Sequence, residues 1–228
     1  MLPTYADAAA MVAALKPEDP VYCFRPHVLT ENARRFVAAF PGDVLYAVKC
    51  NPEDLVLDAL IAGGIRHFDT ASLVEIETVK GRMADAGCYF MHPVKQRGAI
   101  RAAYGRHGVR HFVVDHPDEL DKVVQETDGA RDVIAVVRLA TARGAAVYDL
   151  GGKFGTTVEL GAELLRKAAG LGLKSGISFH VGSQCLMPSS YAAARRLVGE
   201  CFEAAGTEPA VIDVGGGFPT HYVGSEPP

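Results

Sequence analysis

Residues 67–115 of this chain read HFDTASLVEIETVKGRMADAGCYFMHPVKQRGAIRAAYGRHGVRHFVVD. Three short runs rich in Phe, Tyr and Val alternate with two longer segments in which apolar residues recur every three or four positions. The short runs predict buried β-strands, and the longer segments predict helices that bury one face. Because strands and helices alternate, this stretch indicates a parallel sheet covered by helices.

The same alternation extends over the rest of the chain. Capping boxes at Ser72–Glu75 and Thr156–Glu159 predict two helix starts, and a proline near the first turn predicts two more, at Asn51-Pro52 and His116-Pro117. Eight runs are predicted to be strands: Val21–Phe24, Asp43–Lys49, His67–Thr70, Cys88–Met91, His111–Asp115, Val133–Leu139, Gly176–Val181 and Ala210–Val214.

Polar residues stand at the ends of these predicted strands with an even spacing. Lys49, Asp69, His92, Asp115 and Arg138 lie 20, 23, 23 and 23 residues apart, which is one strand–helix unit each. The next interval, to His180, is 42 residues, and the surplus falls in a Gly-rich insertion over Thr141–Thr157. Even spacing without a Gly-rich fingerprint after the first strand favours a (β/α) barrel over a Rossmann sheet, and barrel chemistry gathers at the strands' carboxyl ends.

Composition narrows the class of protein. The 228 residues carry 23 Lys+Arg and 27 Asp+Glu, a net charge of −4, with 49% hydrophobic and 22% charged residues. This balance is typical of a folded globular protein and argues against a nucleic-acid surface. No apolar run reaches the ~18 residues of a membrane span, and the N-terminus lacks the pattern of a signal peptide.

The five cysteines are scattered and odd in number, with no CxxC pair. They indicate reduced thiols and a cytoplasmic protein, without a disulfide framework or a zinc site.

Lys49 closes the apolar run Asp43–Lys49. A lysine at the mouth of a barrel would be partly desolvated, which would lower its pKa and make the free amine available for a Schiff base. The alternative is a lysine whose ammonium group simply reaches solvent where the strand ends.

His180 closes the run Ile177-Ser-Phe-His, near the end of the predicted strand Gly176–Val181. Ser183 follows three residues later. A flat ring at this point could stack on an aromatic cofactor, and the serine hydroxyl could meet a phosphate. A satisfied interior histidine followed by a turn serine is the structural alternative.

Three glycines, Gly215-Gly216-Gly217, follow the last predicted strand. They would let backbone N–H groups approach an anion closely, although the motif is neither a P-loop nor GxGxxG. A tight turn without a ligand is the alternative interpretation.

Asp69 and Arg138 place charges within or beside apolar strands, where each needs a partner. Asp69 could stabilise a protonated lysine or imine, and Arg138 could face a cofactor ring. A plain ion pair between buried groups would serve equally well.

Taken together, the motifs resemble those of the ornithine/diaminopimelate decarboxylase family, whose members use pyridoxal phosphate on an alanine-racemase-like barrel. Seven stretches match in family order: Tyr46–Asn51, Phe68–Ser72, His92–Gln96, Val136–Ala140, Lys153–Gly155, Ser178–Gln184 and Asp213–Pro219.

The resemblance implies a role for each candidate residue. Lys49 would form the internal aldimine, and His180 would stack on the pyridine ring. Asp69 and Arg138 would lie near the cofactor, with Asp69 grouped with the catalytic residues. Three residues, Ser183, Gly216 and Gly217, would contact the phosphate.

The resemblance also implies the reaction: decarboxylation of a basic amino acid, ornithine first and lysine second, for polyamine biosynthesis. Alternatives on the same site are a lysine or diaminopimelate decarboxylase, a racemase, or a non-catalytic regulatory relative that binds pyridoxal phosphate.

Family members are longer than this chain. The resemblance predicts that residues 1–25 form a helix and a strand that pack with a C-terminal β-domain, and that residues 26–228 form a barrel without its last strand. It implies a homodimer for the full-length form. We therefore expect the 228-residue chain alone to be poorly active.

Overall fold

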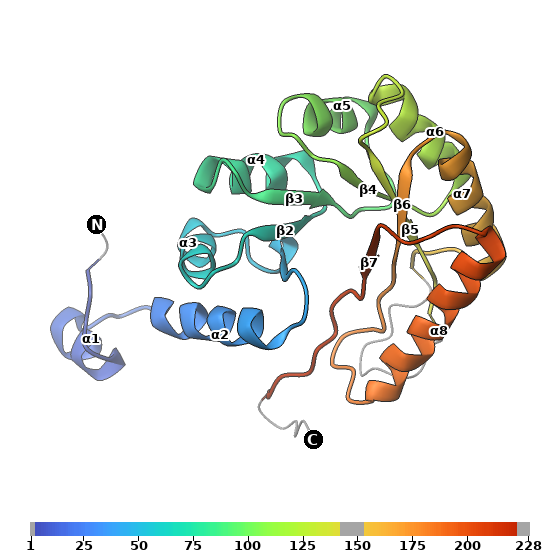
Figure 1. Cartoon of the computed structure of the whole chain (residues 1–228). Helices are drawn as coiled ribbons and strands as arrows, with labels where there is room; N and C mark the ends of the chain where they lie inside the picture. Colours follow the sequence, from blue (N-terminus) through green and yellow to red (C-terminus); the bar gives the residue numbers. More distant parts are fainter. Residues whose placement is uncertain (1–2, 142–152, 223–228) are drawn as a thin grey trace.

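The computed structural model describes residues 3–141 and 153–222. Seven parallel strands pair in the order of the sequence, from β1 to β7, and the sheet curls around its own axis (Figure 1). Among the described residues β1 and β7 do not pair with each other, so the sheet is an incomplete (β/α) barrel. The predicted fold class is confirmed. The strands are β1 (Leu45–Ala47), β2 (His67–Thr70), β3 (Gly87–Phe90), β4 (His111–Val114), β5 (Ile134–Arg138), β6 (Lys174–Ser178) and β7 (Val211–Asp213).

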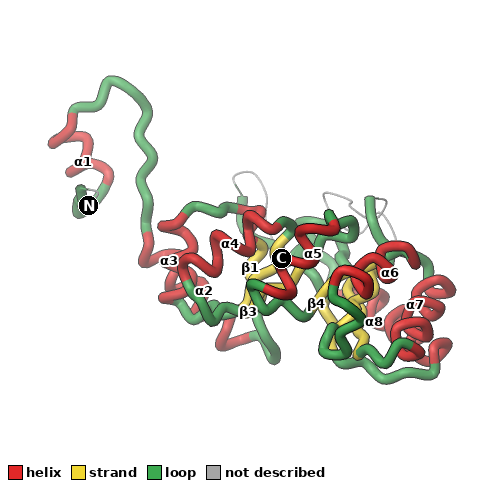
Figure 2. The backbone as a smooth tube through the Cα atoms, turned by 90° about the horizontal axis from the view of Figure 1, so that it is seen from above, coloured by secondary structure: helices red, strands yellow, loops and turns green. Residues whose placement is uncertain are grey.

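From the third helix on, each helix follows one strand and lies outside the curled sheet (Figure 1). The first helix, α1, stands apart from the barrel, as the view from above shows (Figure 2). The helices are α1 (Ala8–Leu15), α2 (Pro26–Ala39), α3 (Asp54–Ala62), α4 (Leu73–Arg82), α5 (Arg97–Gly105), α6 (Pro117–Glu126), α7 (Val158–Gly170) and α8 (Pro188–Ala205), with a short 3₁₀ helix, η1 (Val48–Cys50). No helix within the described ranges combines the length and the apolar character that a membrane crossing requires.

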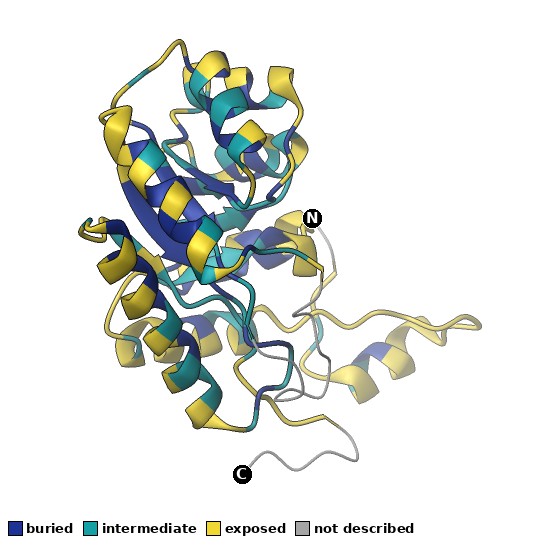
Figure 3. Ribbon diagram, turned by 90° about the vertical axis from the view of Figure 1, so that its right-hand side faces the viewer, coloured by how far each residue is buried: buried dark blue, intermediate teal, exposed yellow. Residues whose placement is uncertain are grey.

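The two faces of the sheet bury different kinds of side chain. Phe68, Phe112 and Ile177 are fully buried in the core. Buried positions gather on the sheet and on the sides of the helices that face it (Figure 3). Parallel pairing in register sets Asp69 beside Tyr89 on the other face, and Arg138 beside Ser178. Because side chains alternate between faces along a strand, the apolar alternate positions secure the fold and leave the inner face free for polar groups.

One predicted strand is wrong. Val21–Phe24 has no strand pairing, and its Tyr22 is fully exposed. A β-rich run becomes a strand only when a neighbour supplies hydrogen-bond partners, and no strand of the described chain lies beside it. The helix expected within residues 1–25 is present as α1.

The other seven predicted strands exist; His67–Thr70 has the predicted bounds, and the bounds of the other six are shifted. β1 covers only three residues of Asp43–Lys49, because the chain turns into η1 at Val48. β6 ends at Ser178, so His180 lies two residues beyond the strand rather than within it. The Gly-rich insertion lies largely outside the described residues.

Helix starts test the local predictions. Ser72 caps α4 by accepting the N–H of Glu75, while the Glu75 carboxylate accepts the N–H of Ala71. The predicted capping box at Thr156–Glu159 does not form: Thr157 caps α7 instead, with its hydroxyl oxygen accepting the N–H of Leu160. The reason is that Thr156 forms a parallel bridge with Leu139, an extension of the sheet that is incompatible with the cap position.

A buried ion pair joins the loop after β3 to α6. Lys95 Nζ lies 2.8 Å from Glu119 Oε1, with the two side chains 0% and 6% exposed. The same ammonium group donates to the carbonyls of Val113 and His92. Burial lowers the pKa of Lys95 to about 8, against the opposing effect of Glu119. The predicted motif contained Lys95, but the sequence assigned it no role.

An aromatic cluster joins the two ends of the open barrel. Phe218, after β7, meets Phe36 of α2 edge-on at 5.3 Å and stacks on Tyr191 of α8 at 5.4 Å, measured between ring centroids. These contacts tie the segment that leaves the glycine turn to α2 and α8, and so they help to fix where that turn lies.

Candidate active site

The candidate residues come from five different strand ends. Lys49 lies in η1 directly after β1, Asp69 in β2 and Arg138 at the end of β5. His180 follows β6, and the glycine turn at 215–217 follows β7. In parallel strands these carboxyl ends share one edge, and this edge is the mouth of the barrel (Figure 1).

Lys49 and Asp69 face each other at this mouth. The distance from Lys49 Nζ to Asp69 Oδ2 is 3.7 Å, and the side chains are 60% and 27% exposed. The expected desolvation of Lys49 is therefore wrong: η1 turns the lysine outward instead of leaving it in the strand. The carboxylate is the more buried partner of the two. Burial raises the pKa of Asp69, and the charge of Lys49 opposes this.

The second oxygen of Asp69, Oδ1, is buried and has no hydrogen-bond partner among the described residues. A buried polar atom without a partner is costly, and it is a common sign of a site that a ligand completes.

His180 is held as a neutral ring. Its Nδ1 accepts the N–H of Gly182 at 3.0 Å, so the ring carries its proton on Nε2. Burial, together with the positive charges of Arg138 and Lys49, lowers the pKa of His180 to about 4, against the opposing charge of Asp213. A neutral flat ring is suited to stacking on a cationic aromatic ring, because it adds no positive charge.

This burial predicts acid sensitivity. A histidine whose folded pKa is lowered stabilises the fold above its ordinary pKa of about 6.5, and this contribution is lost as the pH falls toward about 4. We expect His180→Gln to flatten the fall in unfolding free energy between these pH values by about 1–3 kcal/mol, measured by urea unfolding.

The matched control is His27→Gln, at an exposed position in α2. We expect it to leave the pH dependence as it is in the unmodified chain. Burial also lowers the pKa of His111, so part of the dependence should remain in His180→Gln. An unchanged slope in His180→Gln would contradict the assignment of a buried neutral ring.

The three glycines of the turn serve different purposes. Gly215 and Gly217 have positive φ angles of 67° and 98°. A Cβ atom at Gly215 would lie 2.2 Å from the carbonyl oxygen of Phe179, and one at Gly217 would lie 2.1 Å from that of Gly182. These two glycines are therefore required by the packing of the turn against the chain after β6.

Gly216 borders open space instead. The nearest atom to a Cβ placed there is Nε2 of His180, at 3.6 Å. Tyr191 donates to the carbonyl of Gly216, and Cys185 N–H donates to that of Gly217. In the part of the chain that the structure describes, the N–H groups of Gly216 and Gly217 have no acceptor. Adjacent free N–H groups in a turn favour an anion.

Ser183 is partly exposed and follows Gly182, whose carbonyl lies against Gly217. The structure thus brings Ser183 to the same side of the mouth as the glycine turn. Its contact with a phosphate stays a prediction.

Arg138 is connected to two residues that the sequence did not single out. Its Nη1 donates to Ser178 Oγ at 3.1 Å, and Ser178 Oγ donates to Asp213 Oδ2 at 2.7 Å. Burial lowers the pKa of Arg138, while Asp213, Asp69 and Asp115 oppose it. Asp213 lies inside one of the seven matching stretches, as a charged residue within the otherwise apolar run Val211–Val214. That position was the available signal for it.

A second group of polar residues holds the chain after β5. Gly155 N–H donates to Asp115 Oδ2 at 3.0 Å, and the ring of Phe154 meets that of His92 edge-on at 5.3 Å. These contacts fasten residues 154–155 over the ends of β3 and β4. The sequence places His92 and Asp115 at strand ends but predicts no role for either of them.

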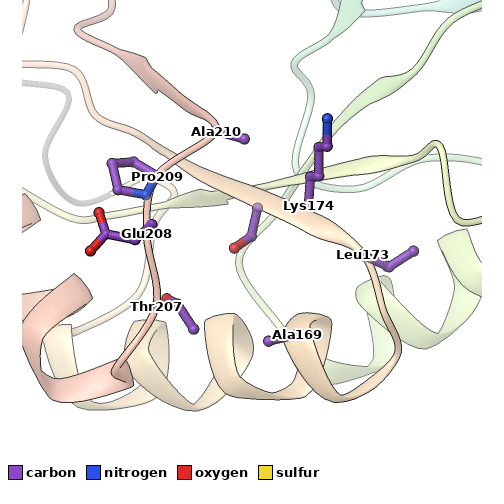
Figure 4. A pocket seen from close by; sticks show the side chains of 8 residues that line it. Ala169, Leu173, Lys174, Thr207, Glu208, Pro209 and Ala210 are labelled. Carbon is purple, nitrogen blue, oxygen red and sulfur yellow. The ribbon is translucent and has the colours of Figure 1, made fainter.

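A surface hollow lies at the other end of the sheet. It is formed by residues such as Lys174, at the start of β6, and by Thr207–Ala210 just before β7 (Figure 4). It is separated from the mouth by the length of both strands. None of the predicted site residues lines it.

The residues at the mouth fit pyridoxal phosphate. An amine can join its aldehyde, and the neutral imidazole of His180 offers a flat surface to its ring. The free N–H groups of Gly216 and Gly217 suit its phosphate. The unpaired Asp69 Oδ1 leaves an acceptor for the group that completes the site.

Comparisons with known proteins agree with this fit. Residues 27–228 match the sequence model described as the pyridoxal binding domain of pyridoxal-dependent decarboxylases. A lysine/ornithine decarboxylase of Selenomonas ruminantium is 41% identical over 182 residues, which are 77% of this chain and 45% of that protein. An ornithine decarboxylase of Panagrellus redivivus is 37% identical over 179 residues, 76% of this chain and 40% of that protein.

Among solved structures, a lysine/ornithine decarboxylase from Vibrio vulnificus complexed with putrescine superposes with a TM-score of 0.78 at 30% identity. The match covers 95% of this chain and 59% of that one. The chain spans less than half the length of the two relatives above. The predicted cofactor, pyridoxal phosphate, is confirmed at the level of the family, since the matched domain is one that binds pyridoxal. On its sequence and on its fold, this chain belongs to the pyridoxal-dependent decarboxylase family.

Proposed function

We propose that this chain is the cofactor-binding part of an enzyme that decarboxylates a basic amino acid, with ornithine as the first candidate and lysine as the second. The observation that carries the proposal is the Lys49–Asp69 pair, 3.7 Å apart at the barrel mouth of a chain from this family. An amine and a partly buried carboxylate at that distance can bind an aldehyde cofactor and stabilise the positive charge that results.

Each residue has a part in this proposal. Lys49 supplies the amine that holds the cofactor, and Asp69 Oδ2 stabilises positive charge on that nitrogen. His180 presents its neutral ring to the cofactor, while Ser183, Gly216 and Gly217 hold the phosphate. Arg138 adds a positive charge next to Asp69 and Asp213.

Pyridoxal phosphate bound here supplies an electron-withdrawing ring that accepts the electrons left when CO₂ departs. The protein orients the substrate and sets the charges around it. Asp69 is partly buried, and this burial raises its pKa; its carboxyl group is well placed to exchange a proton with the Lys49 amine.

The order of substrates rests on the motifs and on the relatives. Three stretches look more like the ornithine branch than the diaminopimelate branch: Ala47–Asn51, Phe68–Ser72 and Gly215–Pro219. Lysine is the second candidate, because the Selenomonas relative is described as acting on both amino acids.

The test supplies the chain and pyridoxal phosphate with ornithine, lysine, arginine, diaminopimelate and alanine in parallel. Release of CO₂ and formation of the amine product are measured for each. We expect the rate of product formation to be highest with ornithine and second highest with lysine, and we expect no product from alanine. The ranking is the readout, because the expected rate of the 228-residue chain alone is low.

Other outcomes identify the alternatives. Inversion of the amino acid without CO₂ would indicate a racemase, and covalent cofactor binding without turnover of any amino acid would indicate a regulatory relative. The proposal also includes a cytoplasmic homodimer, with a role in polyamine biosynthesis, for the full-length form. Light scattering of the purified full-length protein at several concentrations tests the dimer.

A further inference from the structure

A continuous hydrogen-bonded chain runs across three strands beneath the mouth. Arg138 of β5 donates to Ser178 of β6, and Ser178 donates to Asp213 of β7. The other oxygen of Asp213, Oδ1, accepts the N–H of Gly215 at 2.9 Å. We call this set, Arg138, Ser178, Asp213 and Gly215, the relay.

The register of the sheet builds the relay. Arg138 is the Cα partner of Ser178, and Ser178 is the partner of Asp213. In-register parallel strands bring partner side chains to the same face, so three residues far apart in the sequence stand in one row.

The direction of the Ser178 hydroxyl is determined by its neighbours. Arginine can only donate, and an ionised carboxylate can only accept. The hydroxyl oxygen therefore accepts from Arg138, and its single proton goes to Asp213. Ser178 is fully buried, so water cannot replace it in this place.

The relay ends on the turn that the candidate phosphate site uses. Asp213 fixes the first N–H of the turn, while Tyr191 and Cys185 fix the carbonyls of Gly216 and Gly217. The N–H groups of Gly216 and Gly217 then remain as donors without an acceptor in residues 3–141 and 153–222. Without Ser178, the Asp213 carboxylate would lose the bond that keeps Oδ1 aimed at Gly215.

We propose that Ser178 is a positioning residue for the cofactor phosphate: by holding Asp213, it sets the glycine turn whose free N–H groups bind that phosphate. This inference rests on the proposed function, because it assumes that the mouth binds pyridoxal phosphate. It assigns Ser178 and Asp213 to the site without any direct contact with the cofactor.

The test compares pyridoxal phosphate with pyridoxal, which lacks the phosphate. Ser178→Ala removes only the hydroxyl group. We expect its Kd for pyridoxal phosphate to rise about tenfold, the value of one hydrogen bond to a charged group, while the Kd for pyridoxal changes less than about twofold. Ser178→Thr restores the hydroxyl and should recover most of the affinity. Binding is measured by absorbance titration.

Ser175→Ala is the matched control, a buried serine of the same strand that points to the opposite face. It should leave both dissociation constants unchanged. Thermal unfolding of the cofactor-free variants shows which of them fold. Should Ser178→Ala not fold, Asp213→Asn decides the matter, and the same selective loss of phosphate-dependent affinity is expected from it.

Equal losses for both ligands would overturn the inference, because they would reveal a purely structural serine. Unchanged affinity in Ser178→Ala would overturn it as well, while the proposed function would stand. If the unmodified chain bound neither ligand, the proposed function and this inference would fall together.

Discussion

Replacing Lys49 with alanine is expected to abolish covalent binding of pyridoxal phosphate. Lys49 is the amine that faces Asp69 at the mouth, at 3.7 Å, and alanine leaves no nucleophile there. The unmodified chain should develop the visible absorption band of the cofactor joined to an amine, and the variant should not. Borohydride trapping followed by peptide mass mapping should find the pyridoxyl group on Lys49 of the unmodified chain.

Lys174→Ala is the control for this prediction. It removes an exposed lysine at the amino end of β6, at the opposite end of the sheet from the mouth. We expect its absorption and its trapped peptide to match those of the unmodified chain. A band of full strength in Lys49→Ala, or trapping at another lysine, would show that Lys49 is not the cofactor lysine.

Replacing Lys95 with methionine is expected to cause the largest loss of stability. The variant leaves the carbonyls of Val113 and His92 without their donor, and it deprives the buried Glu119 of one of its two ammonium partners. Removing one member of a buried ion pair costs about 3–5 kcal/mol. Urea unfolding should show this loss, together with a fall in Tm on the order of 10 °C.

Lys122→Met is the matched control, because Lys122 pairs with the same Glu119 from a more exposed position. It should cost less than half as much. The double variant Lys95→Met with Glu119→Leu should recover part of the stability, because no buried charge is then left alone. A loss below about 1 kcal/mol in Lys95→Met would refute the idea that this pair secures the loop after β3.

Much of the fold followed from local pattern. The run His67–Thr70 was predicted with the bounds that β2 has, and Ser72 was identified as the cap of α4. Alternation of apolar residues and the chemistry of caps act within a few residues, so a sequence displays them directly. The predicted strand Val21–Phe24 does not form, because a strand needs a pairing partner from another part of the chain and a local pattern cannot supply one.

The candidate site was predicted in part. Lys49, Asp69 and His180 could be named because the evenly spaced strand ends of a barrel converge at one mouth. Ser178 and Lys95 could not be named, because nothing in their local sequence distinguishes a buried serine or lysine with hydrogen-bond partners from an exposed one. Their partners lie 35 and 24 residues away along the chain.

The sequence by itself determined the parallel barrel, its family and the residue types at the mouth, since each depends on local periodicity or on motifs that can be read in order. Only the tertiary structure decided that Lys49 turns outward on η1, that the ring of His180 is neutral, and that the N–H groups of Gly216 and Gly217 find no acceptor among the described residues. These features depend on burial and on the register between strands. Both arise from contacts between distant segments, and no short stretch of sequence contains them.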